Sequence, residues 1–169
     1  MKNLLLFIAI MVGTSAIAQD LPLVHVTPNG TEPVVVEVPG KSASQIYISI
    51  RNWILQTNDN PKEILKAYIP NEMLRFRGYN ESVWSHRLNG YGLAYTITIN
   101  CQDGKYKYEF KNNGIFFPLY RQKNESIFFD KNGNVKEKYA DGKAEYEAFI
   151  NGLNQSIYDY IIGVRKDNG

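Results

Sequence analysis

Six basic and aromatic side chains form the one group in this sequence that suggests ligand recognition. They are Arg75, Arg77, Tyr79, Trp84, Arg87 and Lys107. Arginine binds carboxylates and phosphates through a planar fork of donors, and aromatic rings add apolar contact area. If one face of a sheet stays open to water, these residues could border a shallow surface for an acidic or peptide ligand. The competing interpretation, and the commoner one for such residues, is a solvated strand face with cross-strand charge pairs.

Residue patterns typical of enzymes and metal sites are absent from the sequence. Histidine occurs only as His25 and His86, and no His-x-x-x-His or Cys-x-x-Cys spacing exists. There is no Gly-x-Ser-x-Gly elbow and no glycine-rich phosphate loop. Glu145 and Glu147 stand two apart on a predicted helix, so they point to different sides. We therefore expect no enzyme, no cofactor and no metal, with a hydrolase of unrecognised type as a weaker alternative.

A stretch beginning at Asp130 carries oxygen ligands at alternate positions, as a calcium loop does. That loop needs glycine at its sixth position, where Val135 stands, and glutamate at its twelfth, where Asp141 stands. A tight hairpin turn over residues 130–133 explains the same residues better.

The first eighteen residues have the pattern of a cleaved signal peptide. Lys2 is followed by a short apolar run and by Ala16-Ile17-Ala18, a small-x-small cleavage site. The run is too short to span a bilayer, and no later segment is long enough to do so. We therefore expect an exported chain, periplasmic or secreted, without a transmembrane segment.

Charge and cysteine content narrow the classes of partner and of fold. The formal net charge of +2 argues against nucleic acid or an anionic membrane as the main partner. Cys101 is the only cysteine, so the exported domain has no internal disulfide and depends on packing. We expect a protein, a peptide or a small ligand of the envelope as the partner, together with weak self-association as an open alternative.

A hairpin over residues 93–110 is the clearest structural prediction. Asp103-Gly104 suits a two-residue type I′ turn because both central residues need positive φ. The resulting register pairs Cys101 with Tyr106, Ile99 with Tyr108 and Ile97 with Phe110 on one face, and Asn100 with Lys107, Thr98 with Glu109 and Thr96 with Lys111 on the other. A slip of one residue would bury lysines, so this register is strongly specified.

The remaining elements follow from periodicity and from turn residues. A capping box, Ser42 with Gln45, opens a helix over residues 42–57. The last helix begins after Asp141 as N-cap and ends at Gly163. Strands are expected over residues 33–38, 63–69 and 73–79, a polar loop over 80–90 and a loose lead-in over 19–30, whereas 114–139 has no clear assignment.

Short motifs connect this chain to a known family. They are Tyr47 with Arg51-Asn52-Trp53, Asn60-Pro61-Lys62-Glu63, Leu74-Arg75-Phe76-Arg77-Gly78, Tyr95-Thr96 and Asp103-Gly104-Lys105-Tyr106. In these residues the stretch 31–110 resembles a family of exported domains of unknown function from Bacteroides-type bacteria, whose fold is described as TATA-box-binding-protein-like (TBP-like). The resemblance implies a fold and an exported location but no activity. DNA binding does not follow from the name of the fold.

We therefore predict one α+β domain over residues 31–165. It has a mainly antiparallel sheet of about five strands in β-α-β-β-β-β-α order, with two helices on one face. The predicted function is an exported non-catalytic binding module that uses the open sheet face or an edge strand. The alternative is an envelope structural or assembly protein that acts through aromatic contacts around residues 115–120.

Overall fold

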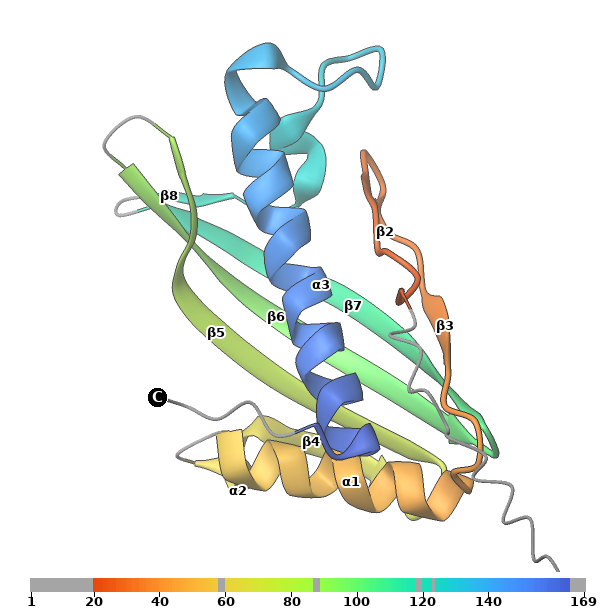
Figure 1. Cartoon of the computed structure of the whole chain (residues 1–169). Helices are drawn as coiled ribbons and strands as arrows, with labels where there is room; N and C mark the ends of the chain where they lie inside the picture. The colour runs from red at the N-terminus through yellow and green to blue at the C-terminus, as the bar shows by residue number, and fades with distance from the viewer. Residues whose placement is uncertain (1–19, 58–59, 87–88, 118–119, 123, 165–169) are drawn as a thin grey trace, which may run out of the picture.

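The computed structural model describes residues 20–57, 60–86, 89–117, 120–122 and 124–164 (Figure 1). Its elements are β1 (Val26–Thr27), β2 (Gly30–Thr31), β3 (Val34–Glu37), α1 (Ala43–Thr57), α2 (Pro61–Ile64), β4 (Leu65–Ile69), β5 (Met73–His86), β6 (Asn89–Gln102), β7 (Lys105–Phe117), β8 (Tyr120–Gln122), the 3-10 turns η1 (Glu125–Phe128) and η2 (Glu137–Tyr139), and α3 (Ala140–Ile162). The main sheet is antiparallel in the order β3-β7-β6-β5-β4, and the short β8 pairs with the far end of β7. The predicted α+β class, the mainly antiparallel sheet and the order of its main elements along the chain are confirmed, with β1, β2, α2 and β8 as additional short elements.

The central hairpin has the predicted register. All six cross-strand pairs expected from the sequence are present. The turn itself is not the predicted type I′, because Gly104 has a φ of 75° whereas Asp103 does not have a positive φ. The turn also positions α1, because the carboxylate of Asp103 accepts the Ala43 N–H at 2.8 Å. The capping box is formed, since the Ser42 N–H donates to Gln45 Oε1 and the Gln45 N–H donates to Ser42 Oγ. The hairpin thus fixes where the first helix begins.

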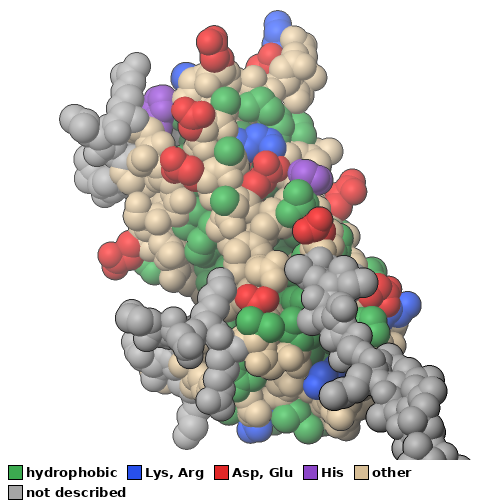
Figure 2. Space-filling view, viewed as in Figure 1, with side chains coloured by type: hydrophobic (Ala, Val, Ile, Leu, Met, Phe, Trp, Pro, Cys, Tyr) green, Lys and Arg blue, Asp and Glu red, His purple; other side chains and the backbone are tan. Residues whose placement is uncertain are grey.

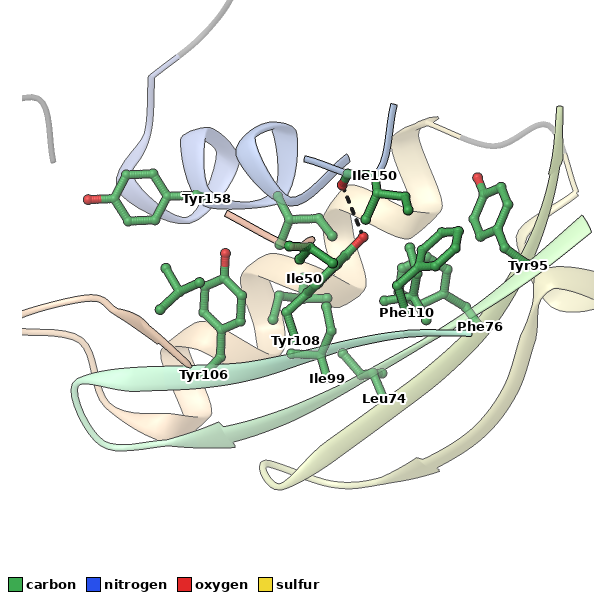
Figure 3. Packing of buried hydrophobic residues seen from close by; sticks show 14 of the residues in the cluster. Ile50, Leu74, Phe76, Tyr95, Ile99, Tyr106, Tyr108, Phe110, Ile150 and Tyr158 are labelled. Atoms are coloured by element: carbon green, nitrogen blue, oxygen red, sulfur yellow. Dashed lines mark hydrogen bonds between the residues drawn. The ribbon is translucent and has the colours of Figure 1, made fainter. Parts of the chain in front are cut away.

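Both long helices cover the same face of the sheet (Figure 1). Figure 3 shows alternate residues of the strands, such as Leu74, Ile99 and Tyr108, pointing toward Ile50 of α1 and Ile150 of α3. The Tyr108 hydroxyl donates to the carbonyl of Ile150 at 3.3 Å. In the same way the Tyr106 hydroxyl donates to Oδ1 of the buried Asn154 at 2.9 Å. These bonds satisfy polar groups that would otherwise be buried without partners.

The predicted loop over residues 80–90 is wrong, because β5 continues through His86 and β6 begins at Asn89. A bulge interrupts the alternation that marks a strand. Asn80 pairs with Leu93 and Trp84 with Tyr91, so three residues of β5 lie opposite Gly92 alone. A Cβ on Gly92 would lie 2.8 Å from the Glu81 carbonyl oxygen. Glycine therefore permits the close approach of the two backbones.

Beyond the bulge, Trp84 lies in the core on the helix side of the sheet, as Leu74 and Phe76 do before it. Its side chain is 2% exposed. The indole stacks on Tyr91 with ring centroids 4.8 Å apart, and it contacts the rings of Phe128 and Tyr146 at 5.3 and 5.5 Å. Trp84 is therefore a packing residue and not part of a surface.

Residues 114–139, unassigned from the sequence, extend the sheet and close one end of the core. Phe128 of η1 is fully buried. The expected turn after Asp130 is present, because Phe129 and Val135 form an antiparallel bridge. Asp130 Oδ1 accepts the N–H groups of Asn134 and Asn132, and these bonds lower the pKa of its carboxyl group. The carboxylate thus stabilises its own turn.

Two boundaries differ from the prediction, and the lead-in is not loose. Glu63 and Ile64 belong to the short α2, so β4 begins at Leu65. The N-cap of α3 is Tyr139, and Asp141 lies in the first turn. The lead-in is tied to α3, since the Val24 N–H donates to the Asn151 side chain. No described helix is long and apolar enough to cross a membrane.

Burial makes Cys101 a poor nucleophile. The side chain is 6% exposed, and burial raises the pKa of its thiol to about 12. The thiolate is the reactive form, so we expect a thiol reagent at pH 8 to label the native chain at least about 100-fold more slowly than the unfolded chain. Labelling at equal rates with and without denaturant would place Cys101 at the surface.

Candidate functional site

The face of the sheet opposite the helices carries the predicted basic residues. Arg75 and Arg77 of β5 alternate with the buried Leu74 and Phe76, so both arginines point away from the core and are exposed. Across the strand pair, Arg75 lies opposite Thr98 and Arg77 lies opposite Thr96. Thr31 and Pro33, which precede β3, line the same surface hollow as these arginines.

A shallow hollow of about 580 Å³ lies on this open face. Its charged lining consists of three cationic side chains and one carboxylate, Arg75, Arg77, Lys111 and Glu109. Polar side chains of Thr96, Thr98 and Asn113 complete much of the surface. The hollow is therefore cationic and rich in hydrogen-bonding groups.

Hydrogen bonds hold parts of the hollow in place. The Nε of Arg75 donates to the Thr98 hydroxyl at 3.1 Å, and the Asn113 amide donates to the Thr96 hydroxyl at 2.7 Å. Glu109 pairs with Lys107 at 2.6 Å. This pair offsets the one negative charge in the hollow.

The predicted site residues separate into three groups. Arg75, Arg77, Tyr79 and Lys107 share the open face, and Tyr79 is 59% exposed with its ring against Phe116. Trp84 was wrongly included, because it is buried on the other side of the sheet. Arg87 lies outside the described residues.

Sequence reasoning omitted Lys111 and Asn113 from the site. The predicted hairpin register already placed Lys111 on the polar face, opposite Thr96, so Lys111 could have been predicted as a site residue. Asn113 is the extra residue of a register shift in β7, since Asn112 pairs with Tyr95 and Gly114 with Ala94. Gly114, with a φ of 152°, was the local sign of this shift, and alternation with Lys111 would have placed Asn113 on the open face.

The groups with the most perturbed acidity are structural. Burial raises the pKa of Tyr106, Tyr108 and Tyr146, and their hydroxyls bond to Asn154, Ile150 and Glu125 inside the core. Within the described residues, no group of three or more His, Cys, Asp or Glu side chains could hold a metal ion. The arrangement on the open face is suited to binding an anion and provides no evident nucleophile.

The helix-bearing side differs in charge from the open face. Figure 2 shows carboxylate side chains gathered over the part of the surface where α3 lies. Asp141 and Glu145 belong to the exposed side chains of this helix. The cationic hollow therefore lies across the sheet from an acidic surface.

Comparisons with known proteins agree with the fold. The family model described as a domain of unknown function (DUF4468) with TBP-like fold matches residues 34–115. A crystal structure of a DUF4468 family protein from Bacteroides ovatus has a TM-score of 0.64 at 16% identity, and it covers 88% of this chain and 93% of that chain. A TBP-like protein from Parabacteroides distasonis has a TM-score of 0.60 at 15% identity, with 79% and 93% covered.

At these identities the two crystal structures establish a shared fold and say nothing about ligands. No curated protein matches the sequence. The resemblance found in the sequence motifs is confirmed by the family model and by both structures. Residues 34–115 thus match the DUF4468 family model, and the chain has a TBP-like fold.

Proposed function

We propose that this protein is an exported, non-catalytic binding module whose open sheet face holds an anionic ligand, with an acidic peptide as the best-fitting chemistry. The observation that carries the proposal is the hollow lined by Arg75, Arg77 and Lys111. Export rests on the signal-peptide pattern of residues 1–18, which lie outside the described part of the chain. A guanidinium group presents paired donors that match a carboxylate.

The scarcity of ion pairs among the described residues of the open face favours this proposal over a merely solvated strand surface. A solvated face would be expected to pair its charges across strands. Among the described residues of this face only Lys107 and Glu109 form an ion pair. Arg75 and Arg77 instead lie opposite threonines, and no carboxylate of the described residues lies within ion-pair distance of either guanidinium. Their positive charge remains available to a ligand.

Charge reversal of both arginines tests the proposal. Two charge-assisted hydrogen bonds of about 1.5 kcal/mol each correspond to roughly a 100-fold change in affinity. We therefore expect Arg75→Glu/Arg77→Glu to lose the partners that the tagged wild-type chain captures from its native envelope, measured by quantitative mass spectrometry. Circular dichroism should show an unchanged fold because both side chains are exposed.

A matched control has the same change in charge elsewhere. Lys131→Glu/Lys138→Glu alters two exposed lysines outside the sheet and should capture the same partners as the wild type. Partners retained by the arginine variant would contradict a role for the open face. Light scattering on the same samples separates self-association from binding, since an envelope assembly protein would form larger species as its concentration rises.

A further inference from the structure

A second hollow lies on the helix side of the sheet, between α1 and the edge strand β4. Its volume is about 540 Å³, and it is lined by Tyr47, Ile48, Arg51, Leu55, Leu65 and Tyr68, together with the buried Ile54. We call it the α1–β4 groove. Its size and its mainly apolar lining are typical of small-molecule sites, which span roughly 300–1,000 Å³.

The sequence of α1 places more apolar surface on the helix than its packing needs. Ile46, Ile50 and Trp53 form the stripe that faces the core. Ile48 and Leu55 lie off this stripe, seven residues apart, and remain 51% and 45% exposed. An amphipathic helix that only covers a sheet would carry polar residues at such positions.

The edge strand supplies the other wall of the groove. Tyr68 is 61% exposed and pairs with Leu74, whose side chain points into the core, so Tyr68 lies on the helix side. Figure 2 shows hydrophobic side chains at the surface where α1 lies. Within the described residues no element packs over this apolar wall, and contiguous apolar surface of this kind marks interaction sites.

The charge of the groove selects the chemistry of its occupant. Arg51 is the one charged side chain among the described residues of the lining, and it has no ion-pair partner in the described part of the chain. Burial raises the pKa of the Tyr47 hydroxyl, and the Arg51 charge opposes this effect, as expected for groups that lie close together. A guanidinium beside apolar walls complements an anionic head attached to an aliphatic chain.

We propose that the α1–β4 groove binds a medium-chain fatty acid, with the carboxylate on Arg51 and the chain along Ile48, Leu55 and Leu65. Arg51 lies three residues after Ile48 and four before Leu55, so apolar side chains flank the guanidinium on both sides along about 10 Å of the helix. Arg75 and Arg77 lie on the opposite face of the sheet. A test of ligand binding at the groove is therefore independent of a test at the open face.

Calorimetric titration with decanoate below its micelle concentration tests the proposal. The wild-type chain should bind decanoate saturably. Arg51→Gln should weaken binding at least tenfold because the carboxylate loses its partner, and Leu55→Glu should weaken it at least as much by placing a carboxylate on the apolar wall. Both side chains are exposed, so both variants should keep the fold.

Two controls define the chemistry and the location of binding. Decyltrimethylammonium has the same chain with a cationic head, so it should bind at least tenfold more weakly than decanoate. Arg77→Gln, on the open face, should bind decanoate as the wild type does.

Several results would overturn the proposal. They are no saturable binding of decanoate, equal binding by Arg51→Gln, or a loss of binding in Arg77→Gln instead. A concentration-dependent dimer that Leu55→Glu disrupts, without decanoate binding, would assign the groove to a second copy of the chain.

Discussion

Replacing Trp84 with alanine is expected to lower the free energy of unfolding by about 3–5 kcal/mol, the usual cost of truncating a large buried aromatic side chain. Trp84 is 2% exposed and contacts three other rings, Tyr91, Phe128 and Tyr146. These rings belong to β6, η1 and α3, so the cavity would loosen three separate elements. Urea denaturation followed by circular dichroism measures the effect.

Two further variants make the test specific. Tyr79→Ala truncates an aromatic residue of the same strand that is 59% exposed, and it should cost less than about 1 kcal/mol. Trp84→Phe should cost less than Trp84→Ala, because the phenyl ring fills part of the space and the buried indole N–H has no hydrogen-bond partner in the described structure. A stable Trp84→Ala variant would show that residues 80–86 form the surface loop suggested by their polarity.

Gly92→Ala is expected to destabilise the chain by about 1–3 kcal/mol through overpacking. The added Cβ would lie 2.8 Å from the Glu81 carbonyl oxygen and 2.9 Å from that of Asn80. Both are backbone atoms, so relief requires the bulge itself to move. The same denaturation experiment measures this cost.

Gly152→Ala is the matched control for that substitution. Gly152 lies on the exposed side of α3 with nothing within 4 Å of an added Cβ. Alanine favours the helix by up to about 1 kcal/mol, so this variant should be slightly more stable than the wild type. If both alanine variants were stabilising, the close approach of β5 and β6 at the bulge would be refuted.

The central hairpin could be predicted because its signals agree. The turn residues Asp103-Gly104 set one register, and that register alone places every apolar residue on one face. The capping box at Ser42 could also be predicted, because both of its hydrogen bonds join residues three positions apart. Local geometry and burial point to one answer in these segments.

Residues 80–86 of β5 were wrongly predicted as a loop, because contacts distant in sequence, and not the local residue pattern, make them a strand. Asn80 and Ser82 are typical turn residues, and the bulge interrupts the alternation of the strand. Pairing with β6 nevertheless continues beyond the bulge, and the aromatic cluster around Trp84 holds that end of the sheet. Tertiary packing overrides local propensity there.

The open face and the α1–β4 groove differ in how far sequence could predict them. Arg75 and Arg77 were assigned correctly to the open face, since each alternates with a buried neighbour on one strand. The groove joins the flank of α1 to Tyr68 of β4, across the intervening chain. Ile48 and Leu55, which lie off the core stripe, were its one visible sign.

Photo-crosslinking from the open face tests the central claim most directly. Tyr79 is exposed on this face, two residues from Arg77, and can be replaced by a photoreactive phenylalanine of similar shape. In the native envelope this position should yield a discrete crosslinked product that Arg75→Glu/Arg77→Glu removes. The same residue placed at the exposed Ala144 of α3 should yield no such product. A product that survives charge reversal, or no product from Tyr79, would contradict ligand binding by this face.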